Sequence, residues 1–172
     1  MTVLTVDRDR RGTSERGIEA LYRAHVTEAQ RLAYLLTGDR TLAEDLVQDA
    51  FVKVLGRFHD LRSRDAFWWY LRRTIVNLST SHFRRRRVER AWLERQHPAD
   101  AAPFPHDLGD RERLRNALMS LRPEQRAAIV LRFYEDLSLA DTAEALGMPL
   151  GTVKSTVSRG LERLREQLPE EE

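Results

Sequence analysis

The chain has 172 residues, with 29 Lys and Arg against 27 Asp and Glu, so its formal net charge at pH 7 is only +2. That length can hold one ordinary domain or two small ones, and the composition is typical of a soluble, helix-rich protein. The sequence contains no cysteine, which excludes disulfides and thiolate metal sites, and its five histidines show no metal-ligand spacing such as i, i+4.

The N-terminal half predicts helices that follow a short tail. Residues 1–13 contain few apolar positions before charges intrude, which indicates a disordered tail, no signal peptide, no membrane span and hence a cytoplasmic protein. From Ser14, apolar residues recur every three or four positions up to Gly38, which should end the first helix. A second helix should begin after Asp39 and end near Gly56.

The polar face of this second helix is largely acidic. Its members are Glu44, Asp45, Gln48, Asp49 and Lys53. On the charge pattern alone, an ordinary solvated helix face is the simpler interpretation of this strip.

Positive charge is concentrated between Arg62 and Arg95, where ten arginines face only three carboxylates, a local balance of +7. Such a block favours a polyanionic partner. Most of it belongs to the stretch AFWWYLRRTIVNLSTSHFRRRR at residues 66–87, whose apolar spacing predicts a helix.

Three consecutive aromatic residues lie in this helix: Trp68, Trp69 and Tyr70. Because a helix turns about 100° per residue, they cannot all point into one small core, so at least one should be exposed. Exposed aromatics beside Arg72 and Arg73 are typical of surfaces that bind single-stranded nucleic acid. The alternative is that the tryptophans are buried and the arginines only solubilise the end of the helix.

Helical periodicity weakens at residues 91–110, where three prolines occur, so we expect a linker with extended segments. Helices resume near Asp110, and Pro123 should open another helix that includes Phe133. The chain closes with an acidic tail at residues 169–172. No stretch shows the alternation of a strand, and we therefore expect an all-α fold.

The stretch SLADTAEALGMPLGTVKSTVSRGLERLREQL predicts two helices around a tight turn. Ser138 and Asp141 form a capping pattern for a helix that should end near Gly147. An apolar stripe from Val153 to Leu168 marks a longer helix, and the pair is typical of a helix-turn-helix, with an ordinary helical hairpin as the alternative. The candidate DNA-contacting residues of the longer helix are Thr152, Lys154, Ser155, Thr156, Ser158 and Arg159.

In this order the two halves resemble bacterial sigma factors of the extracytoplasmic-function type, sigma-70 relatives that keep only sigma regions 2 and 4. The resemblance covers about residues 15–168. LAEDLVQDAFVKVL resembles the region 2.2 helix that docks on the coiled coil of the polymerase β′ subunit. AFWWYLRRTIVNLSTSHFRRRR resembles regions 2.3 to 2.4, and LRPEQRAAIVLRFYEDLSLADTAEALGMPLGTVKSTVSRGLERLRE resembles region 4.

The resemblance implies two small helical domains, a region 2 bundle at residues 14–90 and a region 4 helix-turn-helix at 111–168, joined by the linker. It implies a promoter-specificity subunit rather than an enzyme, with no cofactor and no membrane insertion. Such a subunit binds the polymerase core through the β′ coiled coil and the β flap, recognises the minus-thirty-five and minus-ten elements, and helps open the DNA. The implied partners are duplex promoter DNA, its single non-template strand and, as a further candidate, an anti-sigma factor.

The resemblance also assigns roles to individual residues. The family's polymerase-contacting helix corresponds to Asp45, Gln48, Asp49, Phe51, Val52 and Lys53. Minus-ten recognition corresponds to Arg62, Ser63, Arg64, Trp68, Trp69, Arg72, Arg73 and Asn77. The connector at residues 59–66 corresponds to a loop that captures a flipped base, whose extrusion costs a few kcal/mol. Tyr70 and Ser81 depart from the residues that similar proteins often carry, so no minus-ten sequence is predicted.

Two other classes of protein remain as alternatives. A dimeric regulator could bind duplex operator DNA through the same helix-turn-helix, with the first half as a sensing domain. Against it, the first half shows no apolar heptad seam and carries a nucleic-acid surface of its own. A nucleic-acid enzyme is disfavoured because the sequence shows no paired carboxylates, phosphate loop or activated nucleophile.

Overall fold

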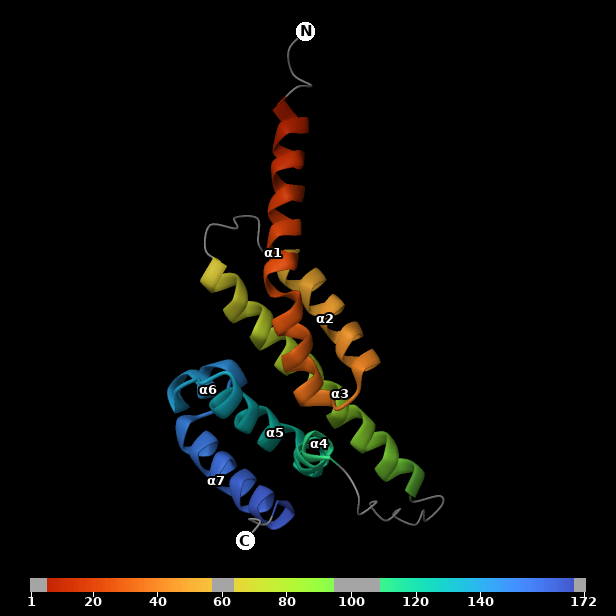
Figure 1. Ribbon diagram of the computed structural model, residues 1–172, viewed down its shortest axis with the longest axis vertical. Helices are drawn as coiled ribbons and strands as arrows, with labels where there is room; N and C mark the ends of the chain where they lie inside the picture. The colour runs from red at the N-terminus through yellow and green to blue at the C-terminus, as the bar shows by residue number, and fades with distance from the viewer. Residues whose placement is uncertain (1–5, 57–63, 95–108, 169–172) are drawn as a thin grey trace.

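The computed structural model describes residues 6–56, 64–94 and 109–168, and within these ranges every regular element is a helix, as predicted. Figure 1 shows their arrangement. None of the helices in the described ranges has an apolar stretch long enough to span a bilayer. The elements are α1 (Val6–Thr37), α2 (Arg40–Leu55), α3 (Arg64–Glu94), α4 (Asp110–Ser120), α5 (Pro123–Ile129), the π-helix η1 (Val130–Tyr134), α6 (Leu139–Leu146) and α7 (Leu150–Gln167).

The first three helices pack pairwise into an N-terminal bundle. The turn between α1 and α2 follows from local chemistry: Gly38 adopts the left-handed conformation with φ of 67°, and the Asp39 carboxylate accepts a 3.0 Å hydrogen bond from the Leu42 amide. Both predicted helix boundaries at this turn are confirmed. Phe67 and Leu71 of α3 are buried in the bundle, as the apolar spacing predicted.

Two predicted boundaries differ from the structure. Helix α1 begins at Val6, so residues 6–13 are helical rather than part of a tail, and α3 continues to Glu94, into the predicted linker. In both places the prediction relied on apolar periodicity. Charged residues such as Arg and Glu form helices well without an apolar stripe, so loss of periodicity marks the end of packing, not the end of the helix. The rest of the predicted linker, residues 95–108, and the tail at 169–172 lie outside the described residues.

The C-terminal unit, α4 to α7, contains the predicted helix-turn-helix. Ser138 caps α6 by accepting a 3.0 Å hydrogen bond from the Asp141 amide, and Gly147 ends the helix with φ of 63°. Helix α5 packs closely on α7 because Gly160 has no side chain: a Cβ atom there would lie 3.1 Å from Cγ1 of Ile129.

The predicted helix from Pro123 through Phe133 is interrupted. Helix α5 ends at Ile129, and the chain widens into η1, in which the Glu135 amide bonds to the Val130 carbonyl at 3.1 Å. Asp136 then takes a left-handed conformation with φ of 51°. As a result Phe133, which was predicted to lie within the helix, is 55% exposed.

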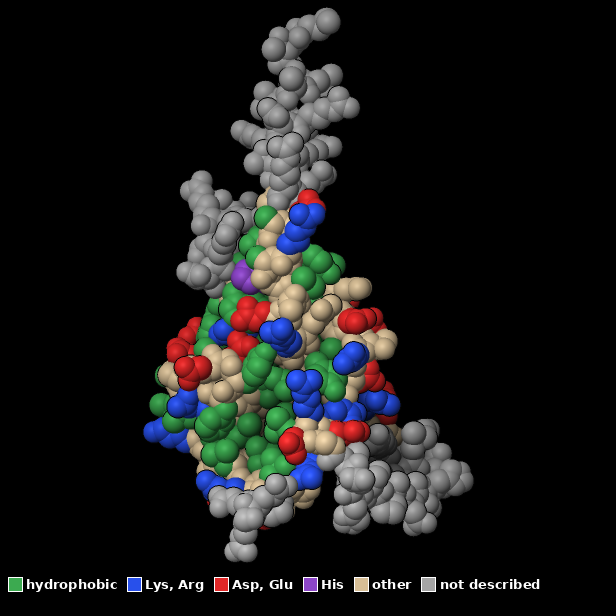
Figure 2. All heavy atoms as spheres, in the orientation of Figure 1, with side chains coloured by type: hydrophobic (Ala, Val, Ile, Leu, Met, Phe, Trp, Pro, Cys, Tyr) green, Lys and Arg blue, Asp and Glu red, His purple; other side chains and the backbone are tan. Residues whose placement is uncertain are grey.

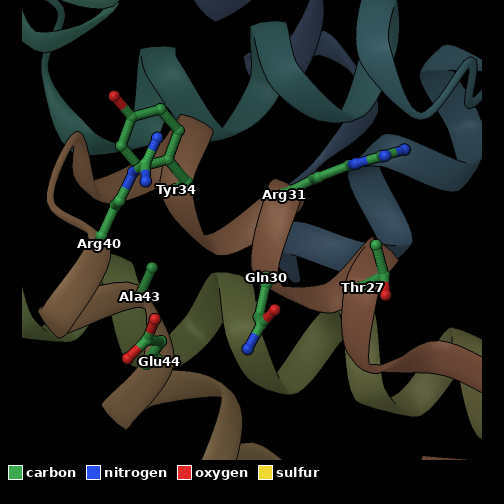
Figure 3. Close-up of a pocket in the computed structure, with 7 residues that line it drawn as sticks. All are labelled: Thr27, Gln30, Arg31, Tyr34, Arg40, Ala43 and Glu44. Carbon is green, nitrogen blue, oxygen red and sulfur yellow. The ribbon is translucent and has the colours of Figure 1, made fainter. Parts of the chain in front are cut away.

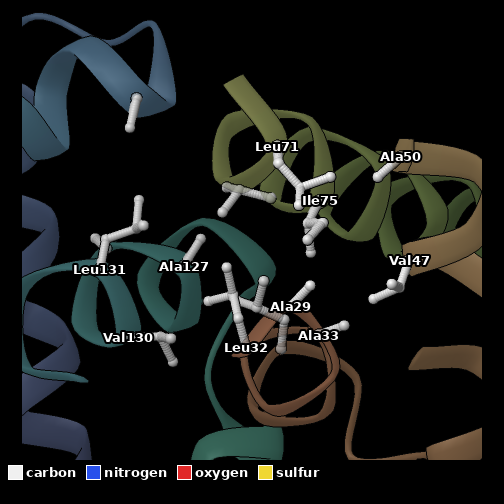
Figure 4. Packing of buried hydrophobic residues seen from close by; sticks show 14 of the residues in the cluster. Ala29, Leu32, Ala33, Val47, Ala50, Leu71, Ile75, Ala127, Val130 and Leu131 are labelled. Carbon is white, nitrogen blue, oxygen red and sulfur yellow. The ribbon is translucent and has the colours of Figure 1, made fainter. Parts of the chain in front are cut away.

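The N-terminal bundle and the C-terminal unit share one hydrophobic core. Helix α5 contacts both α3 and α1, although a long stretch of sequence separates it from each. In Figure 4, Ala127 of α5 lies beside Leu71 and Ile75 of α3 and Leu32 of α1, and all four side chains are fully buried. The two units therefore form a single packed body in this structure.

Candidate nucleic-acid and polymerase interfaces

Helix α7 presents most of its predicted DNA-contacting residues to solvent. Thr152, Lys154, Ser158 and Arg159 are exposed, and Ser155 is half-buried. The first turn of α7 carries no acidic residue that would offset the positive end of the helix dipole. This end of α7 is therefore suited to approach phosphates and base edges.

Thr156, also a member of the predicted set, is only 8% exposed. It belongs to the buried stripe formed by Val153, Thr156, Val157 and Gly160. Threonine has a branched, partly apolar side chain that fits such a stripe. Because it is also a polar residue, its type alone does not distinguish it from its exposed neighbours.

Arg159 lies back along its own helix. Its Nε donates to the Ser155 carbonyl at 3.1 Å, and its Nη2 donates to the Ser155 Oγ at 3.0 Å. The Ser155 hydroxyl in turn donates to the Thr152 carbonyl at 2.9 Å. Arg159 would therefore have to exchange these contacts for those of a base or a phosphate on binding DNA.

Helix α2 presents an acidic face with one apolar residue in it. Asp45, Gln48, Asp49 and Lys53 are exposed, and Val52 is 72% exposed. An apolar side chain surrounded by charges on a solvent-facing helix is a feature of protein-binding surfaces.

Phe51, which the family resemblance assigned to the polymerase-contacting set, is only 3% exposed, as its place among the apolar residues of the helix indicates. The centre of its ring lies 4.9 Å from that of Tyr22 and 5.9 Å from that of Phe67. Phe51 thus anchors α2 in the bundle and holds the acidic face in place, while its neighbour Val52 points outward.

The aromatic residues of α3 divide between the core and the surface. Tyr70 is 48% exposed, which confirms that at least one of the three aromatics is exposed. Trp68 and Trp69 are half-buried and pack against the core, so the alternative in which the tryptophans are buried is partly correct. The ring of Trp68 stacks on that of His25 at 5.5 Å.

Arg72, predicted to lie on the minus-ten surface, is instead buried between the two units. Its Nε lies 2.7 Å from Oε2 of Glu135, which belongs to the C-terminal unit. Its guanidinium carbon lies 5.3 Å from the ring centre of Trp68 and 5.9 Å from that of Trp69. The aromatic and arginine cluster that the sequence predicted is therefore assembled, but a carboxylate from the other half of the chain covers it.

The remaining minus-ten candidates lie elsewhere. Asn77 is exposed and Arg73 is half-buried. Arg64 is the first residue of α3, and its side chain lies outside the described set, as do Arg62 and Ser63 altogether.

Sequence reasoning missed Glu135, because its partner is far away in the chain. Burial raises the pKa of the Glu135 carboxyl; the charge of Arg72 lowers it and that of Glu28 raises it again, and the net pKa is above the ordinary value. Glu135 is thus paired with Arg72, although burial and the charge of Glu28 both disfavour its ionised form.

Arg126 is a second residue that the sequence did not single out. It is buried, and its Nη1 donates to the Leu36 carbonyl at 2.7 Å, while its Nη2 donates to the Leu121 carbonyl at 3.2 Å. Its guanidinium carbon lies 4.7 Å from the ring centre of Phe83. Burial lowers the pKa of Arg126 to about 10, so the guanidinium stays charged at neutral pH.

The C-terminal end of α1 receives cations from the other unit. Besides Arg126, Arg115 donates from Nε to the Gly38 carbonyl at 2.7 Å. The Leu36 carbonyl belongs to the last turn of α1 and the Gly38 carbonyl follows the helix directly, so both arginines lie at the negative end of the helix dipole, where cations are favoured. A more exposed ion pair, Arg84 with Glu124 at 3.0 Å, also joins the two units.

One hollow lies between α1 and α2. In Figure 3, Arg31, Arg40 and Gln30 line a hollow between α1 and α2 but point in different directions. Figure 2 shows Lys and Arg side chains interspersed with Asp and Glu on the face in view. Convergent polar groups, which ligand sites require, are not formed there.

Two family models match the chain: "Sigma-70 region 2" over residues 21–89 and "Sigma-70, region 4" over residues 111–164. The chain is 41% identical to the RNA polymerase sigma-E factor of Streptomyces coelicolor, over 80% of this chain and 78% of that protein. It is 27% identical to the ECF RNA polymerase sigma factor SigX of Bacillus subtilis, over 90% of this chain and 84% of that one.

A solved structure is similar along nearly the whole length. It is the sigma factor RpoE of Bartonella quintana, in complex with the anti-sigma factor NepR, with a TM-score of 0.61 and 27% identity over 96% of this chain and 99% of that chain. The two matched regions cover the N-terminal bundle and the C-terminal unit in the order that the sequence predicted. The chain therefore belongs to the extracytoplasmic-function group of the sigma-70 family.

Proposed function

We propose that this sigma factor directs bacterial RNA polymerase to promoters that carry a minus-thirty-five and a minus-ten element and helps to open the DNA there. The observation that carries the proposal is the presence of two different surfaces on one chain. Helix α7 offers exposed polar residues at a helix end suited to duplex DNA, whereas α3 carries an exposed aromatic ring, Tyr70, and the half-buried Arg73 one turn further along. Region 2 is assigned to residues 14–90 and region 4 to residues 111–168.

We assign minus-thirty-five recognition to the start of α7. Lys154, Ser158 and Arg159 lie on its solvent side, where a recognition helix meets base edges in the major groove. Ser155 keeps its assignment to the same surface, and Thr152 lies nearer the helix end and suits a phosphate contact. Thr156 is left out because it is buried.

We assign minus-ten recognition to α3 and the connector before it. Among the described residues of this surface, Tyr70 and Asn77 are exposed, and Trp68, Trp69 and Arg73 are half-buried. An aromatic ring with neighbouring cations can stack on an unpaired base while holding its phosphate. Arg62, Ser63 and Arg64 keep their assignment from the family resemblance.

We assign polymerase binding to the acidic face of α2, with Val52 as its apolar contact and Phe51 as the internal anchor. The partners proposed are the β′ coiled coil for α2 and the β flap for region 4. An anti-sigma factor is a further proposed partner, since the similar RpoE was solved with one. A protein with these partners acts in the cytoplasm.

The direct test is transcription in vitro with purified core polymerase on a genomic library. We expect start sites that need both core and this chain, and that share sequence elements near minus thirty-five and minus ten. Core polymerase alone is the control. Tight binding to a palindromic duplex without polymerase, and no added start sites, would instead support the dimeric regulator.

A further inference from the structure

A cavity of about 340 Å³ lies between α3 and the start of α5. Four of the residues that line it are arginines: Arg86 and Arg87 of α3, Arg122 directly before α5, and Arg126 within α5. All of its lining residues belong to the described chain, and none of them is acidic. The volume is at the small end of the range of ligand pockets, about 300–1,000 Å³. The cavity is therefore positively charged and has room for a compact anion.

Helical spacing turns the two arginines of α3 toward the C-terminal unit. Residues three and four positions apart share a helix face, so Arg86 and Arg87 lie on the face of Phe83, whose ring centre is 4.7 Å from the guanidinium carbon of Arg126. Arg85 lies on another face, is exposed and does not line the cavity. Because α3 continues well beyond these residues, the helix dipole does not explain their charge.

The charges at this cavity lack counter-ions within the described chain. No described carboxylate lies within ion-pair distance of Arg86, Arg87 or Arg122, and the nearby Glu124 pairs with Arg84 at 3.0 Å instead. Burial raises the pKa of the Glu124 carboxyl, but a backbone hydrogen bond and the charges of Arg84 and Arg87 lower it, and the net pKa is below the ordinary value. The positive potential at this edge of the cavity thus favours a negative charge.

Arg126 has a buried donor that is not used. Only 4% of the residue is exposed, and two of its guanidinium nitrogens donate to the carbonyls of Leu36 and Leu121. Its Nε has no hydrogen-bond partner among the described residues. A buried N–H without a partner costs free energy, and such groups are rare in folded proteins. Because Arg126 lines the cavity, an oxygen of an anion bound there is the acceptor available to this donor.

We infer that this cavity binds the terminal phosphates of a small polyphosphate, such as the diphosphate or triphosphate group of a nucleotide, between the two units. Guanidinium groups bind phosphate oxygens through paired N–H donors. A terminal phosphate carries nearly two negative charges at pH 7, whereas each phosphate of a nucleic-acid backbone carries one. Several arginines that converge on one small cavity therefore favour the free polyphosphate over a backbone phosphate.

The ligand would contact both units of the chain. Arg86 and Arg87 belong to the N-terminal bundle, and Arg122 and Arg126 belong to the C-terminal unit. A ligand that binds the folded chain and not the unfolded one stabilises it by mass action. Binding at this cavity should therefore raise the resistance of the full-length chain to urea. This ligand site goes beyond the proposed function and does not depend on it.

The test is a calorimetric titration of the full-length chain with inorganic pyrophosphate, at an ionic strength held constant with sodium chloride. Arg87→Ala removes a cavity arginine from the N-terminal bundle, and Arg122→Ala removes one from the C-terminal unit. Arg85→Ala is the matched control, since it removes the same charge from the neighbouring position of α3 outside the cavity. All three side chains are exposed, so each variant should keep its fold, which circular dichroism checks.

We expect pyrophosphate to bind the parent, and Arg87→Ala and Arg122→Ala each to weaken that binding by about tenfold or more, the loss of one charge-assisted hydrogen bond. Arg85→Ala should change it by less than about twofold. Pyrophosphate should also raise the urea midpoint of the parent but not that of Arg122→Ala. Absence of binding would overturn the inference. Equal losses in Arg85→Ala and Arg87→Ala would also overturn it, because they would show diffuse attraction to α3 rather than a site.

A competition experiment separates a free polyphosphate from nucleic acid. Pyrophosphate is added to the chain in complex with a fluorescent oligonucleotide, single-stranded or duplex. An oligonucleotide that lies along α3 alone should depend on Arg85 and Arg87 alike and not on Arg122. If oligonucleotide binding needs both Arg87 and Arg122 and pyrophosphate does not compete, the cavity holds a backbone phosphate and the inference is wrong. Neither experiment contains polymerase, so both outcomes are independent of the transcription assay.

Discussion

The two helices assigned to DNA, α3 and α7, differ in how much of their surface is exposed. On α7, four of the six predicted residues are exposed and only Thr156 is buried. On α3, by contrast, Arg72 is buried and both tryptophans are half-buried. The reason is position: α7 packs on its own unit along one face, whereas α3 packs on the N-terminal bundle and also on α5 and α6. A helix with one free face shows its function in its amphipathic pattern, and a helix covered on two sides does not.

The largest expected effect comes from breaking a buried contact between the two units. Arg126→Ala should destabilise the chain by about 2–4 kcal/mol, because it removes a charge-assisted hydrogen bond to Leu36 and leaves that buried carbonyl unpaired. Urea unfolding measures the change. The control is Arg122→Ala, an exposed neighbour, which should change stability by under about half a kcal/mol. Similar losses in both variants would mean that Arg126 does not hold the units together.

A smaller effect is expected on α7, the more exposed of the two helices. Arg159→Ala should cost on the order of 1–3 kcal/mol in promoter binding by the holoenzyme if the guanidinium pairs with a guanine, and should relax preference at one base position. Binding to a set of minus-thirty-five variants measures this, with Arg163→Ala, one turn further along and exposed, as the control. A uniform loss across all variants would make Arg159 a phosphate contact.

The smallest effect is expected on α2, which belongs to the same bundle as α3 but has an exposed polar face. Asp49→Arg should weaken binding to core polymerase about tenfold, or about 1.4 kcal/mol. The substitution removes the attraction of Asp49 for a basic group on the polymerase and replaces it with repulsion between like charges. The free energy of unfolding should move by under about half a kcal/mol, because Asp49 is exposed. Co-purification with core polymerase and urea unfolding measure the two quantities. Undiminished binding of Asp49→Arg to core polymerase would show that this face of α2 is not the polymerase-binding surface.

The sequence by itself determined the features that depend on neighbouring residues. The cap at Ser138, the left-handed stops at Gly38 and Gly147, and the apolar stripe of α7 all involve residues within a few positions of each other. Their chemistry is therefore readable as a local pattern. The order of the two units and their family resemblance rest on the same local patterns.

Only the tertiary structure decided which predicted residues solvent can reach. Thr156 points into the buried stripe of α7, although it is a polar residue among exposed polar neighbours. Phe51 belongs to the apolar face of α2, as its spacing in the sequence indicates, and the structure shows what that face packs against. The pairing of Glu135 with Arg72 depends on the packing of one unit on the other, and the sequence pattern did not predict the π-helix before Glu135. Arg126 and Leu36 lie 90 positions apart, and a contact across that distance leaves no periodic signal because it is selected by packing and charge in three dimensions.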